Sequence, residues 1–178
     1  MTKNLIDIAI IVGSDSDLEI INETVKTLTE FEITYKINIA SAHRTTHHLK
    51  ECIESAQKSG AKVFIAGAGM SAALPGAIAA ETVLPVIGVP IMGTSLSSLD
   101  SLFSIVQMPR GAPVACVAVG KSGAVNAALL AIEIIAITNT HLRDKLIKYK
   151  KSAADKVIEK DSNLQKVGIE TFIKERNK

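Results

Sequence analysis

Five short apolar segments recur along the chain, and each is followed by a small-residue turn and then by a helical pattern. The first is almost continuously apolar and rich in β-branched residues, as strands buried on both faces are. Strands that alternate with helices predict a parallel sheet with right-handed crossovers and helices on both of its faces. The expected strands are residues 6–12, 34–40, 63–66, 86–89 and 114–119.

The composition is that of an ordinary globular protein. The 178 residues are enough to bury the core of one domain, and no linker or internal repeat indicates a second. Hydrophobic residues make up 47% and charged residues 21%, and the net charge of +2 does not favour nucleic acid or a membrane as a partner. Glu81 is the only charged residue between Val63 and Leu99, so this region is expected to be largely buried.

The two cysteines, Cys52 and Cys116, fall within an expected helix and an expected strand, without a CxxC spacing. We therefore expect free thiols in a reducing cytoplasm rather than a zinc site or any other metal site. Residues 1–7 lack the pattern of a signal peptide, and no segment reaches the roughly 18 uninterrupted apolar residues of a membrane span. The sequence thus predicts a cytoplasmic protein.

A hydroxyl, an imidazole and a guanidinium occur together in Ser41, His43 and Arg44, between the second expected strand and an expected helix over residues 46–59. In open α/β sheets such turns lie outside the carboxyl ends of the strands, where ligands bind. Arg offers a planar fork of donors for phosphate or carboxylate, and His can exchange a proton near neutral pH. The turn favours an enzyme that acts on a phosphorylated metabolite; the alternative is that its polar groups only begin the helix.

The first strand is followed by Gly-Ser-Asp-Ser-Asp at residues 13–17 and by a helix with apolar residues at spacings of three and four over 18–28. Ser14 with Asp17 three residues later resembles a capping box, with Asp in place of Glu. The functional alternative is that Ser14 and the backbone N–H groups face a phosphate while Asp17 accepts from sugar hydroxyls. The local sequence leaves both interpretations open.

The loop after the third strand fits two enzymatic motifs only loosely. Gly67-x-Gly69-x-x-Ala72 matches a dinucleotide fingerprint, but no acidic residue ends the next strand to bind a ribose. Gly69-x-Ser71-x-Ala73 resembles a nucleophile elbow, but the acid and histidine expected downstream are not in place. Backbone N–H groups of such a small-residue loop instead suit a carboxylate or a small anionic intermediate.

The last third of the chain is expected to form two helices. The first, over residues 124–136, is apolar almost all round, which predicts burial, often at a subunit interface. The second pairs an apolar stripe with a face of mixed charge, which favours an oligomerisation arm over a nucleic-acid-binding tail. The stripe consists of Leu142, Leu146, Tyr149, Ala153 and Val157.

Four motifs occur in order at residues 13–17 (GSDSD), 41–45 (SAHRT), 66–69 (AGAG) with 74–76 (LPG), and 100–111 (DSLFSIVQMPRG). Together they resemble the PurE family over residues 6–160. The resemblance implies a three-layer α/β/α sandwich with a parallel, flavodoxin-like sheet and a C-terminal helical arm. We expect one catalytic domain over residues 1–160, including its oligomerisation helix, and a charged tail over 161–178.

The resemblance also implies an activity. Bacterial members of the family are 5-(carboxyamino)imidazole ribonucleotide mutases of purine biosynthesis, which move a carboxylate from the exocyclic nitrogen to ring carbon 4 without a metal, flavin or nucleotide cofactor. It further implies a homo-octamer with active sites at subunit contacts. Functional coupling to an ATP-dependent carboxyaminoimidazole ribonucleotide synthase is expected as well.

The same resemblance assigns roles to residues. His43 would be the general acid and base, because one histidine can protonate the nitrogen as carbon dioxide leaves and then take the proton from carbon 4. The Gly-rich loop would hold carbon dioxide or the carboxylate near the ring. The implied substrate-binding residues are Ser14 and Arg44 for phosphate, Asp17 for the ribose hydroxyls, and Ser41, Gly69 and Ser71.

The loop before Leu74-Pro75-Gly76 departs from the family pattern. Many members have Gly-Ala-Ala-His there, whereas residues 70–73 of this chain are Met-Ser-Ala-Ala. The related carboxylase class, which uses free carbon dioxide, has Arg and Asn after its Gly, so the retained Leu-Pro-Gly favours the mutase. A serine hydrolase using Ser71 and a non-catalytic flavodoxin-like module remain as alternatives, although an aromatic content of 3% argues against flavin.

Overall fold

The computed structural model describes residues 5–92 and 96–176. Parts of the expectations for residues 1–7, for the buried region from Val63 to Leu99 and for the tail over 161–178 therefore lie outside the described residues. Within these residues five strands form one sheet in the order β2-β1-β3-β4-β5, and every neighbouring pair is parallel, as predicted. The strands are β1 (Ile8–Val12), β2 (Tyr35–Ile39), β3 (Val63–Ala68), β4 (Val86–Pro90) and β5 (Ala115–Cys116).

The last strand is much shorter than the six residues expected from its apolar sequence. Among the described residues β5 pairs only with β4, through the register Ile87 with Ala115 and Gly88 with Cys116. It lies at the edge of the sheet, so only one neighbour holds it in an extended conformation. The apolar sequence predicted a strand correctly at this position but overestimated its length.

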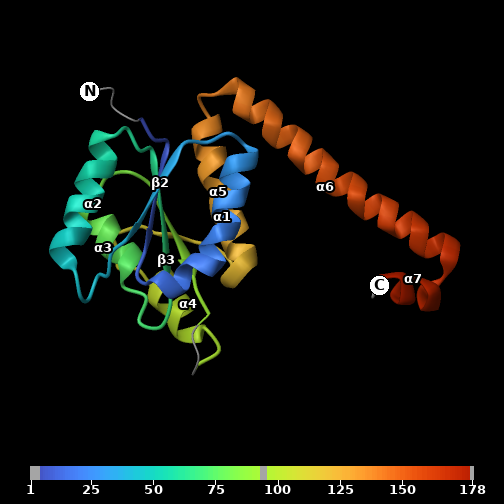
Figure 1. Cartoon of the computed structure of the whole chain (residues 1–178), viewed down its shortest axis with the longest axis horizontal. Coiled ribbons are helices and arrows are strands. Elements are labelled where there is room, and N and C mark those ends of the chain that lie inside the picture. The colour runs from blue at the N-terminus through green and yellow to red at the C-terminus, as the bar shows by residue number, and fades with distance from the viewer. Residues whose placement is uncertain (1–4, 93–95, 177–178) are drawn as a thin grey trace. The chain divides into compact units, whose positions relative to one another are not determined.

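Helices cover both faces of the sheet (Figure 1). One face carries α1 (Leu18–Glu30) and α5 (Gly120–Ala136), which are joined by a buried hydrogen bond of 2.8 Å from the Thr24 hydroxyl to the Ala124 carbonyl. The other face carries α2 (Thr46–Lys58), α3 (Leu74–Glu81) and α4 (Leu99–Val106). The result is the three-layer α/β/α sandwich that the resemblance implied.

Two strand glycines let helices approach the sheet closely. A Cβ on Gly67 would lie 2.8 Å from Ile21 Cδ1 of α1, and a Cβ on Gly88 would lie 2.5 Å from Ile105 Cγ2 of α4. Both distances are shorter than real side chains tolerate, so an alanine at either position would force the helix outward. Every residue of β1, β3 and β4 is buried, which explains their near-continuous apolar sequences.

Both cysteines are free thiols, as predicted. Cys52 is buried within α2 and Cys116 is half-buried in β5. Burial raises the pKa of each thiol, so neither is activated as a nucleophile. None of the helices in the described residues is both long and apolar enough to cross a membrane.

The chain comprises two compact units, one up to Ile135 and one from Ala136 onward. The second unit contains α6 (Thr140–Val167) and α7 (Ile169–Arg176). Asn139 caps α6 by accepting from the Leu142 N–H at 3.1 Å, and Gly168, with a φ of 76°, ends it. The helix runs unbroken across residue 160, and the division into residues 1–160 and 161–178 stays a prediction.

Candidate active site

Three turns that carry predicted site residues lie next to one another at the carboxyl edge of the sheet. They follow β1, β2 and β3, which are adjacent in the order β2-β1-β3. Backbone hydrogen bonds continue the sheet into these turns, from the Gly13 N–H to the Gly67 carbonyl at 3.3 Å and from the Ala40 N–H to the Val12 carbonyl at 2.9 Å. The chain reverses direction across the sheet at β1, and this is where open α/β sheets bind ligands.

The first turn forms the capping box that its sequence suggested. The Ser14 N–H donates to Asp17 Oδ2 at 3.1 Å, and Ser14 Oγ accepts from the Ser16 N–H at 3.4 Å. Ser14 Oγ also donates to Asp15 Oδ1 at 2.9 Å. The hydroxyl of Ser14 is therefore engaged within its own turn, and a ligand there would meet an ordered hydroxyl rather than a freely rotating one.

Asp17 is the buried carboxylate of the site, with 8% of the residue exposed. Burial raises its pKa; hydrogen bonds from the backbone of Ser14 and Gly13 act in the opposite direction without cancelling this effect. The carboxylate binds backbone N–H groups of the loop, which is the structural role that the sequence left open. A contact with ribose hydroxyls stays a prediction.

The second turn is organised by the side chain of Ser41. Its Oγ accepts from the backbone N–H groups of His43 and Arg44, each at 3.3 Å, and from Arg44 Nε at 3.4 Å. Within the described residues the Ser41 proton has no acceptor, because the hydroxyl acts only as acceptor there. A ligand at Ser41 would therefore be a hydrogen-bond acceptor, as phosphate and carboxylate oxygens are.

Arg44 joins the second turn to the first. Its Nη2 donates to the Gly13 carbonyl at 3.2 Å, while its Nε donates to Ser41 Oγ. These bonds place the guanidinium beside the end of β1 and leave the other donors of the fork for an anion. His43 is exposed beside it, and its imidazole bonds to nothing in residues 5–92 and 96–176.

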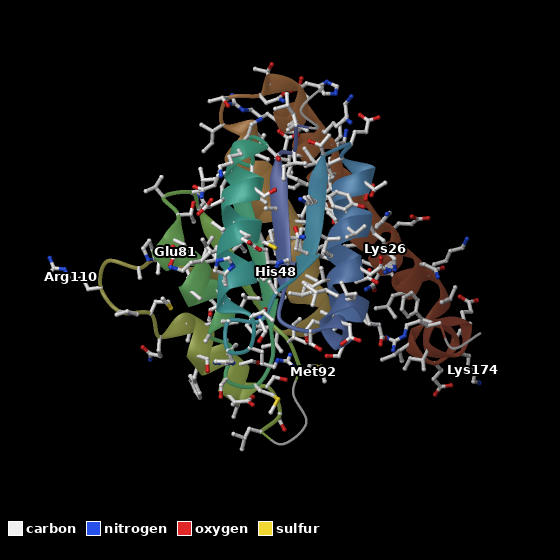
Figure 2. All side chains as sticks on the ribbon, turned by 60° about the vertical axis from the view of Figure 1, so that its left-hand side comes forward. Lys26, His48, Glu81, Met92, Arg110 and Lys174 are labelled. Atoms are coloured by element: carbon white, nitrogen blue, oxygen red, sulfur yellow. The ribbon has the colours of Figure 1, made fainter. Side chains whose placement is uncertain are left out.

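The other two histidines near this turn lie on the outside of α2. His47 and His48 belong to its first turn, where Figure 2 labels His48, and their side chains are exposed. Each Nδ1 lies near a Glu51 oxygen, at 3.4 Å for His47 and 3.6 Å for His48. His48 Nε2 is 3.6 Å from Cys52 Sγ. No group of three or more metal-binding side chains is placed to hold an ion in the part of the chain that the structure describes.

The third turn, from Gly69 to Ala73, is tight and largely exposed. The Ala72 N–H donates to the Met70 carbonyl at 2.8 Å, and the Ala73 N–H donates to the Ser71 carbonyl at 2.6 Å. Met70 has a φ of 53°, in the left-handed region that glycine adopts more readily. Its side chain is 68% exposed, so an apolar group stands at the edge of the site.

Neither alternative motif gains support from this loop. Gly67 lies inside β3 and is required by the packing of Ile21, so it is no part of a phosphate-binding turn. Ser71 is exposed, and among the described residues no histidine or carboxylate hydrogen bonds to its hydroxyl. The activating base that a serine nucleophile needs is therefore not in contact with it.

The sequence indicated no role for Thr45, whose hydroxyl closes the second turn in the structure. Thr45 Oγ1 accepts from the Ser41 N–H at 2.8 Å and donates to the Ser41 carbonyl at 3.2 Å. A threonine directly before a helix is typically interpreted as an N-cap. Its position in the SAHRT motif was the only available signal, and that signal did not reveal which partner the hydroxyl takes.

The fold and these turns define a flavodoxin-like α/β protein with a candidate anion site at its topological switch point. Within this class, the chain belongs to the AIR carboxylase family, whose model matches residues 7–156.

Relatives support this placement over most of the chain. An N5-carboxyaminoimidazole ribonucleotide mutase of Pyrococcus horikoshii is 49% identical over 168 residues, which are 94% of each chain. A phosphoribosylaminoimidazole carboxylase of Saccharomyces cerevisiae is 43% identical over 99% of this chain, but that region is only 30% of the yeast protein. The crystal structure of Treponema denticola PurE superposes with a TM-score of 0.79 at 31% identity, over 88% of this chain and 97% of that one.

Proposed function

We propose that this protein is an N5-carboxyaminoimidazole ribonucleotide mutase of purine biosynthesis. The main support is the turn that contains His43 and Arg44. The His43 imidazole is exposed there, and the Arg44 guanidinium is held at the end of β1 by the Gly13 carbonyl. A proton carrier next to an anion holder is what carboxylate transfer on a phosphorylated ribonucleotide needs. The names and coverage of the bacterial and archaeal relatives agree with it.

The reaction needs two proton movements and no net acid or base. The exocyclic nitrogen gains a proton as its bond to the carboxylate carbon breaks and carbon dioxide is released. Carbon 4 then attacks carbon dioxide, and the new bond is followed by loss of the proton on carbon 4. His43 donates the first proton and accepts the second, and so returns to its starting state.

Binding is assigned to groups on all three turns. Arg44 and Ser14 hold the phosphate, with Ser14 turning to it the proton that it donates to Asp15 in the free protein. Ser41 donates its free proton to an acceptor of the ligand. Asp17 accepts from ribose hydroxyls through the lone pairs that its hydrogen bonds to the backbone leave unused. Gly69 and Ser71 face carbon dioxide or the carboxylate during transfer. Two observations support these assignments: the three turns are adjacent, and Ser41 and Arg44 each keep hydrogen-bond donors that the described residues do not use.

We further propose that the protein is a cytoplasmic homo-octamer that takes its substrate from an ATP-dependent carboxyaminoimidazole ribonucleotide synthase. Exposed apolar side chains on α4 support assembly, since Leu99, Phe103 and Val106 are each more than half exposed. Arg110 extends outward at the tip of the following loop (Figure 2). Free thiols agree with a reducing compartment. Light scattering on the purified protein tests the octamer.

The decisive experiment offers the purified protein a choice of substrates. One reaction contains the carboxyamino ribonucleotide without added bicarbonate, and the other contains the uncarboxylated ribonucleotide with excess bicarbonate. A mutase forms the ring-carboxylated product rapidly in the first only. Efficient product in the second only would mean a carboxylase, the activity named for the yeast relative, and no product in either would refute both.

A further inference from the structure

Thr45 occupies the N-cap position of α2 but does not cap it. Its carbonyl accepts the first helical hydrogen bond, from the Leu49 N–H at 2.9 Å, as an N-cap residue does. Its side chain makes no capping hydrogen bond to the helix. Thr and Ser at this position normally use the hydroxyl to satisfy a free N–H of the first helical turn. The hydroxyl of Thr45 is directed elsewhere at the expense of the helix.

The hydroxyl instead closes the turn that contains His43. Thr45 Oγ1 accepts from the Ser41 N–H at 2.8 Å and donates to the Ser41 carbonyl at 3.2 Å, alongside the backbone bond from the Thr45 N–H to the same carbonyl at 3.0 Å. Three hydrogen bonds therefore join residue 41 to residue 45. The two residues between Ala42 and Thr45, His43 and Arg44, are held at the tip of a closed loop.

We propose that Thr45 is a positioning residue, whose hydroxyl fixes the backbone of Ser41 and thereby orients the His43 imidazole. The proposal rests on the role of His43 in the proposed function. Ser41 is the link, because its Oγ accepts from the His43 N–H at 3.3 Å and its backbone is held by Thr45. A freed Ser41 would allow the His43 backbone to shift, and a misplacement near 1 Å can cost about 100-fold in rate.

The rival explanation is that Thr45 only stabilises the fold. Three substitutions separate the two. Thr45→Val keeps the shape and removes the hydroxyl, whereas Thr45→Ser keeps the hydroxyl and removes a methyl group. Thr46→Val makes the same chemical change one residue further on, at an exposed threonine that begins α2. Thr45→Val removes no helix cap, but it removes two hydrogen bonds to Ser41, so the melting temperature of the protein should fall modestly.

Steady-state kinetics of the mutase reaction give the first readout. We expect Thr45→Val to lower kcat about 10- to 100-fold with KM changed less than about threefold, because transition-state alignment is lost while binding groups remain. Thr45→Ser and Thr46→Val should retain kcat within about threefold of the wild type. An unchanged kcat in Thr45→Val, or a Thr45→Ser variant as slow as Thr45→Val, would overturn the proposal.

A second readout does not depend on activity. The chain has four histidines, so the ring Cε1–H signal of His43 in a ¹³C-histidine-labelled sample can be assigned by its loss in His43→Asn. Thr45→Val should shift or broaden this signal and leave that of His141 unchanged, and Thr45→Ser should restore it. An unmoved His43 signal overturns the positioning role. An inactive wild type in which Thr45→Val still moves the signal would refute the mutase assignment and support the role of Thr45.

Hydrogen exchange of the unaltered protein covers the case in which Thr45→Val does not fold. The Ser41 amide lies in a turn and donates to Thr45 Oγ1, so it should exchange more slowly than a free amide of its sequence. Exchange at the free rate would mean that the closure is not maintained, and the proposal would fail.

Discussion

The two ends of the same three strands carry polar clusters of very different kinds. At the amino ends of β1, β2 and β3, Asp7 accepts from Lys62 Nζ at 2.7 Å and from the Thr34 hydroxyl at 2.7 Å. At the carboxyl ends, Ser41 and Arg44 bond chiefly to backbone groups and keep free donors. In the first cluster the side chains pair with one another, whereas in the second they are held by the backbone and keep donors for a ligand.

The comparison shows that residue type alone does not identify a site. An Asp, a Lys and a Thr next to a depression of about 630 Å³ look as promising as a Ser, a His and an Arg in an open turn. That depression is lined by apolar and polar residues together, among them Leu5, Ile33 and Lys36. Counting which donors and acceptors are already used separates structural clusters from candidate sites.

The largest effect is expected from His43→Asn. Loss of the proton carrier should reduce turnover by about 1,000-fold or more, while affinity for the carboxylated ribonucleotide stays within a few-fold. Turnover assays and calorimetric titration check both values. His47→Asn is the matched control, since His47 is exposed in the first turn of α2 and its replacement should leave turnover and affinity unchanged. Equal activity in His43→Asn would remove the functional difference between the two ends of the sheet.

A smaller effect is expected from Arg44→Gln. The change removes the charge at the candidate phosphate position and the link to Gly13, and hydrogen bonds to charged groups contribute about 1.5–3 kcal/mol. Product affinity should therefore fall about 10- to 100-fold, as measured by titration calorimetry. Lys58→Gln, at an exposed Lys paired with Glu54 on the same helix, is the control and should bind normally. Normal binding by Arg44→Gln would place the anion elsewhere.

Asp7 and Asp17 should respond to pH in opposite ways. Burial raises the pKa of Asp7, but hydrogen bonds from Lys62 and Thr34 outweigh it and leave a pKa below 3.8. Its stabilisation is therefore present above the unfolded value and is lost as pH falls through the folded one. The pKa of Asp17 is raised by burial above 3.8, so its contribution is greatest at low pH and is lost as pH rises through the folded value.

Unfolding free energies measured against pH for Asp7→Asn and Asp17→Asn test this contrast. The deficit of Asp7→Asn relative to the wild type should shrink below about pH 4. The unfolding free energy of Asp17→Asn should increase relative to that of the wild type as pH rises from about 4 toward neutrality. Each difference should be on the order of 1 kcal/mol. Parallel curves for the two variants would contradict the assigned environments.

The smallest effect is expected from Lys62→Met, which keeps the aliphatic stem and removes the ion pair with Asp7. The Lys62 side chain is more than half exposed, so stability should fall by about 0.5–1 kcal/mol in denaturant titrations. Both kcat and KM should stay at wild-type values, because the cluster lies at the far end of the strands. A change in KM would show that the amino-end cluster also serves binding.

Sequence patterns predicted the sheet well because its central strands are buried on both faces and must be apolar throughout. They failed where a single contact decides the local structure. The helix expected from residue 124 begins at Gly120, since Gly123 has no Cβ to collide with the Ala118 carbonyl. Glycine is unfavourable inside a helix, and the close approach of Ala118 cannot be inferred from neighbouring residues.

The candidate site was predicted by motif, but its internal bonding was not. The resemblance pointed to Ser41, His43 and Arg44 without indicating that Ser41 accepts from two backbone N–H groups. Thr45 was missed for the same reason, because a hydroxyl before a helix has several possible partners and only the folded turn selects one. Residue types can be read along the chain, whereas the choice of partner is a property of three-dimensional geometry.

The order of the elements along the chain matters while the protein is being synthesised. The three turns of the candidate site, which follow β1, β2 and β3, are complete by Ala73. However, α5, which covers one face of the sheet together with α1 (Figure 1), begins only at Gly120. A nascent chain that has emerged as far as β4 therefore exposes apolar strand surface that has no cover yet, and such surface is prone to aggregate. Ribosome-bound fragments that end before α5 should therefore bind ribosome-associated chaperones more strongly than fragments that include α5.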